Sequence, residues 1–382
     1  MITVIIDRNS TILSPTTAQM NVLAKSGLID VDYYMVGISK LPGFENPIKL
    51  SSNESVLGMS PAAQRAANEA IATSHLYLEF DIQTLAKLLG AHYSLNPDLI
   101  TFGPGSDELL QRIVNAFCGP GQELVHSKNA YMQFPIYAKV AGATPIAADD
   151  NDMKYDVDNI INQVTDKTRI VLIANPDNPS GTYLSSAEVR RLHESLPLNV
   201  LLVVDAAYEE FASSPDYESA TKLVHEFENV IVTRTFSKVY GMAGLRLGWC
   251  YGPKWIIELL TRIGPSFPVN NIAFAAGIEA VKDQQHVRKV LDHNCIWLSE
   301  MTKSFQDINL KVYPTQTNFL LVEFPSRSGK TADDVNTYLN QNGIIPRQFR
   351  VDEFKDKLRF TVGHDDGMKK TIQLMNQFFD HL

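Results

Sequence analysis

Cysteine is scarce in this chain, where only Cys118, Cys250 and Cys295 occur among 382 residues. Three widely spaced cysteines exclude a disulfide framework and a Cys-x-x-Cys metal site. The nine histidines show no metal-ligand spacing either. We therefore expect a protein of the reducing cytoplasm that holds no metal ion.

Positive charge is also in deficit, because 34 lysines and arginines face 43 acidic residues, for a formal net charge of -9. Such a surface repels phosphate backbones and anionic lipid, which argues against nucleic acid and membrane partners. No run approaches the ~18 apolar residues of a membrane span. The first apolar run is closed by Asp7 and Arg8, and is too short for a signal-peptide core.

Short runs rich in Val, Ile and Leu predict strands that are buried on both faces. They are "RIVLIANP", "NVLLVVDAAY", "NVIVTRTFSK" and "TNFLLVEF". Helical patterns such as "SAEVRRLHESL" lie between them. This alternation predicts an α/β fold with a doubly wound, mostly parallel sheet, because parallel strands need crossover helices.

The pattern changes from about residue 275, where one long helix is predicted, followed by strands around 310–324 and a closing helix at 368–381. These elements predict a second, smaller α+β unit. We expect a large domain over residues 49–270. An N-terminal arm at 1–48 and a small domain at 271–382 complete the expected organisation.

Three of the buried runs end in polar residues, at the edge where parallel sheets bind ligands. The polar endings are Asn175 to Asn178, Asp205 to Tyr208, and Ser237 to Lys238. Each alone has an ordinary explanation as a turn, a helix cap or a surface lysine. Together they place an amine and a carboxylate at one sheet edge, and Arg246 follows Lys238 by eight residues.

The stretch "FGPGSDELL" indicates a phosphate cradle. Gly103 and Gly105 let the backbone approach a ligand, and Ser106 and Asp107 begin a predicted helix with free N–H groups. The stretch lacks both the Gly-Lys-Ser/Thr of a nucleotide P-loop and the Gly-x-Gly-x-x-Gly dinucleotide pattern. A lysine amine, a carboxylate and an anion site are what pyridoxal 5'-phosphate requires, so we predict that cofactor.

These motifs resemble those of the fold type I pyridoxal-phosphate aminotransferases, and among them the histidinol-phosphate aminotransferases. The resemblance runs from "KLSSNE" at 49–54 to "LRFTVG" at 358–363. "RTFSKVYGMAGLRLGW" is similar to the family's lysine segment, and "NPDNPSGTY", "VVDAAYEEF" and "GSDELL" to its other blocks. The resemblance implies a fold type I PLP-transferase.

By this resemblance, Lys238 carries the imine bond to the cofactor and Asp205 pairs with the ring nitrogen. Asn178 and Tyr208 are implied to hydrogen-bond the ring oxygen. A carboxylate beside the pyridine nitrogen favours its protonated form, which accepts the electrons released when the Cα–H bond breaks. Lys238, Asp205 and Tyr208 are therefore the expected catalytic residues.

Further cofactor ligands follow from the same resemblance. The implied phosphate ligands are Ser106, Asp107, Ser237 and Arg246, with help from Thr235. Tyr131 is implied to lie over the ring, although a core tyrosine is an equal reading of its sequence. Tyr77 matches a tyrosine that reaches the neighbouring subunit's phosphate, which implies a homodimer. Leu78 stands where the family has proline, so a backbone constraint on Tyr77 is missing.

On the substrate side, Arg359 matches the family's anchor for the α-carboxylate, which a guanidinium fork fits well. Histidinol phosphate has no α-carboxylate and carries its phosphate at the far end. Arg347 and Tyr34 match positions expected to contribute to that pocket. Arg350 has two readings, as a further phosphate ligand or as a surface charge, and the surface reading is favoured.

The leading hypothesis is a cytoplasmic transaminase of histidinol phosphate and 2-oxoglutarate in histidine biosynthesis. Its partners would be a small-molecule amino donor and a 2-oxo acid acceptor. An aromatic amino acid aminotransferase is the alternative, and an amino-acid-phosphate decarboxylase a more distant one. A binding module that has lost its chemistry is disfavoured, because Lys238, Asp205 and Arg246 are present.

Overall fold

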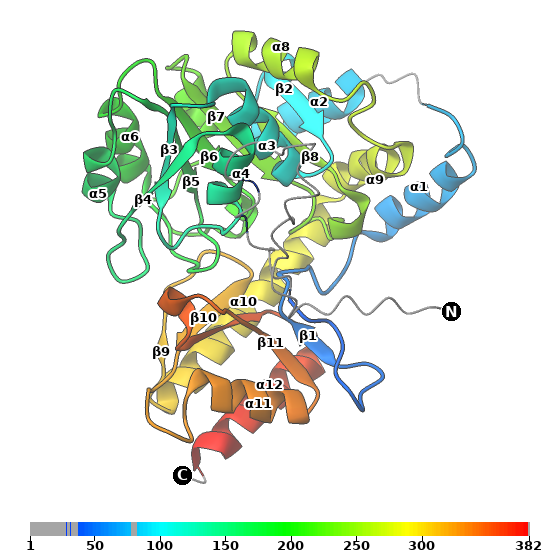
Figure 1. The fold of residues 1–382 in the computed structure, drawn as a ribbon. Coiled ribbons are helices and arrows are strands. Elements are labelled where there is room, and N and C mark those ends of the chain that lie inside the picture. Colours follow the sequence, from blue (N-terminus) through cyan, green and yellow to red (C-terminus); the bar gives the residue numbers. More distant parts are fainter. Residues whose placement is uncertain (1–27, 29–30, 32–36, 78–81, 381–382) are drawn as a thin grey trace, which may run out of the picture.

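The computed structural model describes residues 28, 31, 37–77 and 82–380, and these residues form two β-sheets. One sheet has seven strands and lies in the upper part of Figure 1, and the other has five and lies below it. Helix α10 (Gln284–Asp307) runs from the upper part into the lower part.

The larger sheet has the strand order β2-β8-β7-β6-β5-β3-β4. Its strands are β2 (Ile100–Gly103), β3 (Glu123–Ser127), β4 (Thr144–Ala148), β5 (Thr168–Ala174), β6 (Leu201–Asp205), β7 (Val230–Thr235) and β8 (Gly248–Tyr251). Strands β7, β6, β5, β3 and β4 run parallel to one another. Strand β8 runs antiparallel to both β7 and β2, because the segment from β7 to β8 returns the chain without a crossover helix. The predicted doubly wound, mostly parallel sheet is therefore confirmed.

Every residue of β6 and β7 is buried, as expected for strands in a sheet with helices on both faces. The helices of this part are α1 (Pro61–Ile71), α2 (Ile82–Tyr93), α3 (Ser106–Phe117), α4 (Phe134–Ala141), α5 (Val157–Asn162), α6 (Ser186–Glu194), α7 (Thr221–Val224), α8 (Lys254–Ile263) and α9 (Asn271–Lys282). Short 3₁₀ helices span Pro97–Leu99, Glu209–Phe211 and Ala243–Leu245.

The smaller sheet has the order β1-β11-β12-β10-β9. Its strands are β1 (Ile48–Leu50), β9 (Lys311–Val312), β10 (Phe319–Glu323), β11 (Ile344–Gln348) and β12 (Lys357–Thr361). Helices α10, α11 (Ala332–Gln341) and α12 (Asp365–Asp380) and a 3₁₀ helix at Asp352–Phe354 accompany it. The run "TNFLLVEF" supplies β10, which pairs antiparallel with β12 and β9 rather than joining the parallel sheet.

The single long helix predicted from about residue 275 is two helices, α9 and α10, so that prediction is wrong. The chain bends at Asp283, whose side chain caps α10 by accepting from the backbone N–H of His286. An aspartate at this position stabilises a new helix start more than a continuing helix.

Helix α10 contributes to two hydrophobic cores. Helix α9 packs against α1 and α2, and Val287 and Val290 of α10 belong to the hydrophobic core around the larger sheet. Trp297 and Met301, further along α10, belong to the core of the smaller sheet. The two-domain division stays a prediction, with its boundary moved from residue 270 into α10.

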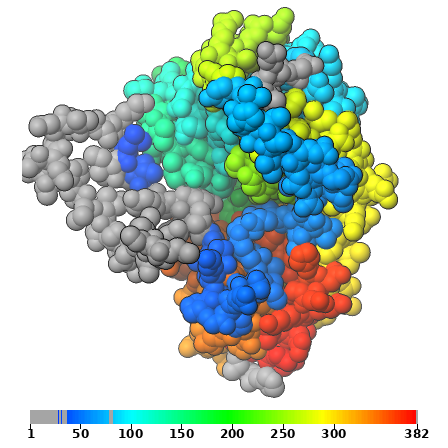
Figure 2. All heavy atoms as spheres, turned by 90° about the vertical axis from the view of Figure 1, so that its right-hand side faces the viewer, coloured from blue at the N-terminus to red at the C-terminus, as the bar shows by residue number. Residues whose placement is uncertain are grey.

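The segment 37–77 connects both parts on the face shown in Figure 2. Its blue atoms extend from the lower part, beside the orange and red C-terminal residues, to the upper part beside the yellow ones. Within the described ranges, no helix has the length and apolar character needed to cross a membrane.

A buried ion-pair cluster fixes the turn that follows β6. Arg234 of β7 is 1% exposed and pairs with Glu209 and Glu210 at 2.6 and 2.8 Å. Its guanidinium also lies 4.6 Å from the ring centre of Tyr93 and 5.2 Å from that of Trp249. Because the two glutamates come directly after Tyr208, these ion pairs hold the Tyr208 turn against β7.

Replacing Arg234 by Met should destabilise the fold by about 3–5 kcal/mol, because two buried carboxylates lose their cation. Thermal unfolding of the purified protein measures this as a fall in Tm. Arg190→Ala is the matched control, since the Arg190–Glu226 pair is exposed and its loss should hardly change Tm. Equal falls in both variants would contradict the role given to Arg234.

Candidate active site

A cavity of about 250 Å³ lies at the carboxyl ends of the parallel strands, where residues of the smaller sheet meet them. Most of the site residues predicted from sequence line it: Ser106, Asp107, Tyr131, Asn178, Asp205, Tyr208, Ser237, Lys238, Arg246, Arg347 and Arg359, together with Thr235. The structure thus brings together in one pocket residues that are up to 253 positions apart between Ser106 and Arg359.

One end of the cavity is built by the start of α3 and by Arg246. Gly105, at φ +91°, precedes the helix, and a Cβ atom there would lie 2.3 Å from Nη2 of Arg246. Arg246 has a left-handed backbone at φ 56°, and its Nη1 donates to Ser237 Oγ at 3.3 Å. Ser237 Oγ also accepts from Thr235 Oγ1 at 2.9 Å. Helix N–H groups, hydroxyls and a guanidinium converge here, which is the composition of a phosphate site.

The carboxylate of Asp107 is held by two tyrosines. Tyr137 donates to Asp107 Oδ1 at 2.9 Å and Tyr131 at 3.2 Å, while Arg246 Nη2 lies 3.6 Å from Oδ2. The Asp107 side chain is therefore occupied by protein partners. Its backbone N–H, in the first turn of α3, is the group that it can offer to an anion. The Tyr137 contact was missed at the sequence level because "QFPIY" shows only a helical apolar pattern.

Asp205 ends β6 and accepts from Thr233 Oγ1 at 3.1 Å. Burial raises its pKa to about 7, and the nearby charge of Asp107 adds to the rise. The hydrogen bond from Thr233 and the charge of Lys238 act in the opposite direction. A buried carboxylate with a raised pKa in a cleft favours a cationic ligand group beside it.

Lys238 follows β7, the strand next to β6, and lines the same cavity as Asp205. Its Nζ is 5.3 Å from the ring centre of Tyr208. Both residues line the cavity with Asn178. An amine thus stands beside the hydroxyl and amide groups predicted to hold a ring oxygen.

The turn that contains Asn178 is stabilised by the buried carboxylate of the preceding residue, Asp177. Tyr155 donates a short hydrogen bond to Asp177 Oδ1, and Ser180 Oγ donates to Oδ2 at 2.6 Å. Burial raises the pKa of Asp177 to about 7. Sequence inspection read this stretch as a turn and missed the buried network, because the distant partner Tyr155 carries no local signal.

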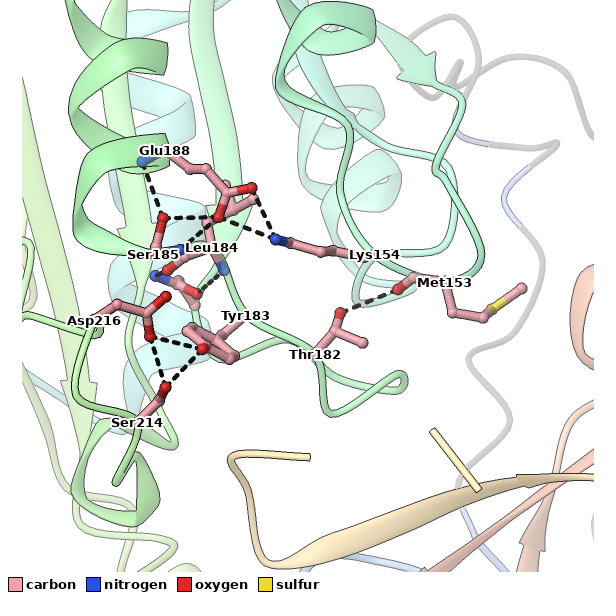
Figure 3. A network of polar contacts seen from close by, with 10 residues as sticks. Met153, Lys154, Thr182, Tyr183, Leu184, Ser185, Glu188, Ser214 and Asp216 are labelled. Carbon is pink, nitrogen blue, oxygen red and sulfur yellow. Dashed lines mark hydrogen bonds and ion pairs between the residues drawn. The ribbon is translucent and has the colours of Figure 1, made fainter. Parts of the chain in front are cut away.

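The chain beyond this turn is tied down at several points (Figure 3). Thr182 donates to the Met153 carbonyl at 3.1 Å, and Lys154 pairs with Glu188 at 2.8 Å. Tyr183 donates to Asp216 at 2.7 Å on the other side. These contacts hold the loop between β5 and α6 rigid next to the cavity.

Arg359 and Arg347 come from neighbouring strands of the smaller sheet and stand directly opposite each other in the β11–β12 register. Each is 6% exposed. Arg359 donates a short hydrogen bond to Asn178 Oδ1 and another to the carbonyl of Ser51 at 3.1 Å. Two buried guanidinium groups side by side repel each other, so an anion bound between them is favoured.

Tyr208 is contacted by a residue that sequence reasoning missed. Asn53 Nδ2 donates to Tyr208 Oη at 2.9 Å, and Asn53 also bonds to Thr361 of β12. Asn53 is 2% exposed and has φ 54°. Neither its burial nor its left-handed backbone can be read from "KLSSNES".

Three remaining predictions concern residues away from this pocket. Tyr77 is 78% exposed and stacks on Phe267, with ring centres 4.0 Å apart, and it does not line the cavity of its own chain. Arg350 is exposed, in agreement with its reading as a surface charge. Tyr34 lies outside the described residues. In the described part of the chain, no group of three or more His, Cys, Asp or Glu is arranged to hold a metal ion.

Comparison with known sequences identifies the family. The family model for aminotransferase class I and II matches residues 45–373. The chain therefore belongs to the class I and II aminotransferases. It is 40% identical to a histidinol-phosphate aminotransferase of Maricaulis maris over 359 residues, covering 94% of this chain and 99% of that protein. A protein of the same name from Paramagnetospirillum magneticum is 39% identical over 354 residues, covering 93% of this chain and 98% of its own length.

Solved structures agree with this assignment. A histidinol-phosphate aminotransferase from Sinorhizobium meliloti, in complex with pyridoxal-5'-phosphate, superposes with a TM-score of 0.81 at 26% identity, covering 90% of this chain and 92% of that chain. A putative histidinol-phosphate aminotransferase from Erwinia carotovora atroseptica gives 0.83 at 26% identity, covering 90% and 99%. The resemblance seen in the motifs and the predicted fold type I PLP-transferase are confirmed.

The raised pKa of Asp205 predicts a pH-dependent stability of the ligand-free protein. Between the ordinary aspartate value of 3.8 and about 7, the folded state holds a proton that the unfolded chain releases, so this residue lowers stability as pH rises. Asp205→Asn removes this effect. Thermal unfolding of both apoproteins should show that the Tm of the variant minus the Tm of the wild type increases from pH 4 to pH 7. A difference that stays constant or shrinks over that range would contradict the raised pKa.

Proposed function

We propose that this chain is a pyridoxal-phosphate-dependent aminotransferase that exchanges the amino group between histidinol phosphate and 2-oxoglutarate. The observation that carries the proposal is the convergence of Lys238, Asp205 and the paired Arg347 and Arg359 in one cavity. The aminotransferase family and the cofactor-bound S. meliloti structure support pyridoxal 5'-phosphate. The relatives at about 40% identity are named histidinol-phosphate aminotransferases and support the substrate.

The residues present fit the cofactor. Gly105 has φ +91°, a conformation that residues with a side chain rarely adopt, and the Arg246 guanidinium lies against it, as a tight phosphate cradle requires. In the same cavity, the buried carboxylate of Asp205 favours a cation, which a protonated pyridine nitrogen supplies. Asn178 and Tyr208 line the same cavity, and we assign their polar groups to the ring oxygen.

When bound, pyridoxal phosphate supplies an electron sink for the electrons of the substrate's broken Cα–H bond. The Lys238 amine removes the proton from the substrate Cα as a general base and returns a proton as a general acid. Asp205 keeps a positive charge at the ring nitrogen, and Arg246 with the start of α3 fixes the phosphate. The Arg234 cluster and the Asp177 network keep the Tyr208 and Asn178 turns in place.

We assign substrate anions to the two arginines. Arg359 binds the α-carboxylate of glutamate, and Arg347 binds the phosphate of histidinol phosphate, which lacks an α-carboxylate. Their position across from each other in the register gives one pocket two adjacent cations. This favours substrates with two anionic groups, or a phosphate dianion, over tyrosine or phenylalanine, whose far end is aromatic.

Alanine variants of the two arginines test the substrate assignment. Arg359→Ala should lower kcat/KM for glutamate, whose α-carboxylate it binds, and also for histidinol phosphate, because Arg359 holds Asn178 in the cavity. Arg347→Ala should lower kcat/KM for histidinol phosphate selectively. Losing a charge-assisted hydrogen bond costs about 1.5–3 kcal/mol, roughly one to two decades. Steady-state kinetics with each substrate measures both effects, and Arg350→Ala, an exposed arginine of the same segment, should leave them unchanged.

An unchanged kcat/KM for histidinol phosphate in Arg347→Ala would overturn that assignment. A wild type that ignores histidinol phosphate and turns over tyrosine or phenylalanine would replace the proposal by the aromatic aminotransferase alternative.

We further propose a homodimer whose active sites are shared between subunits. Tyr77 is exposed and lies outside its own cavity, so it serves a cofactor phosphate only in a partner subunit. Tyr77 stacks on Phe267, and further exposed apolar side chains lie near these two residues in sequence, at Ile71, Leu76 and Ile263. Such a group of apolar residues is typical of a buried protein interface. The three unpaired cysteines fit a cytoplasmic location, which we also propose.

Hybrid dimers test the shared site. Lys238→Ala and Tyr77→Ala homodimers should each be nearly inactive, but a mixed dimer contains one site with both native residues. Random exchange should restore about a quarter of wild-type activity, because half of the dimers are mixed and each has one intact site. Sedimentation velocity confirms the dimer, and co-purification of one untagged variant with the other, affinity-tagged variant confirms the exchange. No recovery in exchanged dimers, or a fully active monomer, would contradict the proposal.

A further inference from the structure

A closed set of hydrogen bonds connects the smaller sheet to the hydroxyl of Tyr208. The backbone N–H of Asn53 donates to Thr361 Oγ1 at 3.0 Å, and Thr361 Oγ1 donates back to Asn53 Oδ1 at 3.0 Å. The amide Nδ2 of Asn53 then donates to Tyr208 Oη at 2.9 Å. All three residues are buried, at 2%, 4% and 3% exposure for Asn53, Thr361 and Tyr208.

The Asn53 amide is placed with its oxygen toward Thr361 and its NH₂ group toward Tyr208. The backbone N–H of Asn53 occupies one lone pair of Thr361 Oγ1, and the Thr361 hydroxyl gives its proton to Asn53 Oδ1. The NH₂ group only donates, so Tyr208 Oη is the acceptor of this contact.

A tyrosine hydroxyl that accepts from an amide keeps its single proton for another partner. Tyr208 and Asn53 both line the cavity, so the proton is directed to a ligand there. We propose that Asn53 is a positioning residue that fixes Tyr208 as the hydrogen-bond donor to the ring oxygen of pyridoxal phosphate. This inference rests on the proposed function, and it assigns to Asn53 a role through Tyr208 rather than direct contact with the reacting atoms.

The backbone around Asn53 is built to hold this orientation. Asn318 Nδ2 donates to the Asn53 carbonyl at 3.2 Å. The φ of 54° is a left-handed conformation that asparagine, aspartate and glycine adopt more readily than other residues. The ring of Tyr208 meets Phe319 edge-on, with centres 5.4 Å apart. Both the hydroxyl and the ring of Tyr208 are thus held by residues attached to the smaller sheet.

Charged groups also lie near Tyr208, and they affect any pH midpoint that is measured at the site. Lys238 lies 5.3 Å from its ring centre, and Asp205 precedes it on the same turn. Arg359 lies 4.9 Å from the ring centre of Phe319, the ring that packs on Tyr208. Glu209 and Glu210 follow Tyr208 but are paired with Arg234 on β7. The test must therefore separate hydrogen-bond direction from added charge.

Asn53→Asp is the informative substitution, because it keeps the shape and the left-handed backbone but replaces the donor by an acceptor. The Tyr208 hydroxyl would then donate its hydrogen bond to the new carboxylate and would no longer donate to the ring oxygen. A hydrogen bond to a charged oxygen corresponds to about one pKa unit or more. The pH midpoint of the bound cofactor's visible absorbance should rise by about one unit, and the cofactor Kd of the apoprotein should rise about tenfold.

Three companion variants control this result. In a Tyr208→Phe background, Asn53→Asp should produce no further shift, whereas a purely electrostatic effect of the new charge would persist. Asn53→Gly removes the amide without strain at φ 54° and should give a smaller shift than Asn53→Asp. Thr361→Ser keeps the hydroxyl and should retain the wild-type midpoint.

Two outcomes would overturn the inference: an unshifted midpoint in Asn53→Asp, or the same shift in the Tyr208→Phe background. Cofactor titration of the wild type distinguishes failure of the Asn53 inference from failure of the proposed function. A wild type that binds no pyridoxal phosphate refutes the function itself, while normal binding with an unresponsive Asn53 refutes only the role of Asn53.

Discussion

The hydrogen bonds of Arg359 hold the two halves of the site together. Its guanidinium, rooted in β12 of the smaller sheet, donates to Asn178 after β5 of the larger sheet and to the carbonyl of Ser51 in the connecting segment. A buried guanidinium is stable only where such acceptors meet it. The cavity therefore exists where the carboxyl ends of the parallel strands face the smaller sheet, and its position depends on this contact.

Charge is distributed along the cavity in a way that matches its proposed ligands. Arg246 and the α3 N-terminus attract one anion, Asp205 attracts a cation, and Arg347 with Arg359 attract a second anion, and all of them line the same cavity. Buried polar residues behind the cavity wall hold these groups in place. Arg234 holds the turn after β6, and Asp177 with Tyr155 holds the turn after β5. Activity and stability are thus linked through the same buried polar groups.

Much of this arrangement could be predicted from sequence where the signal is local. The runs that became β5, β6 and β7 are continuous in Val, Ile and Leu because both faces are buried, and the polar residues at their ends follow from parallel geometry. Asp283, which divides α9 from α10, was overlooked because the helical pattern continues on both sides of it. Asn53, Tyr137 and Tyr155 were missed because their partners are distant in sequence, at Tyr208, Asp107 and Asp177.

The central claim, that Lys238 is the residue to which pyridoxal phosphate attaches, has one direct test. The purified protein is incubated with pyridoxal phosphate and reduced with sodium borohydride, and its peptides are mapped by mass spectrometry. The account predicts a pyridoxyl group on Lys238, and none on this peptide in Lys238→Ala. Stoichiometric labelling of a different lysine, or an unlabelled wild type, would contradict it.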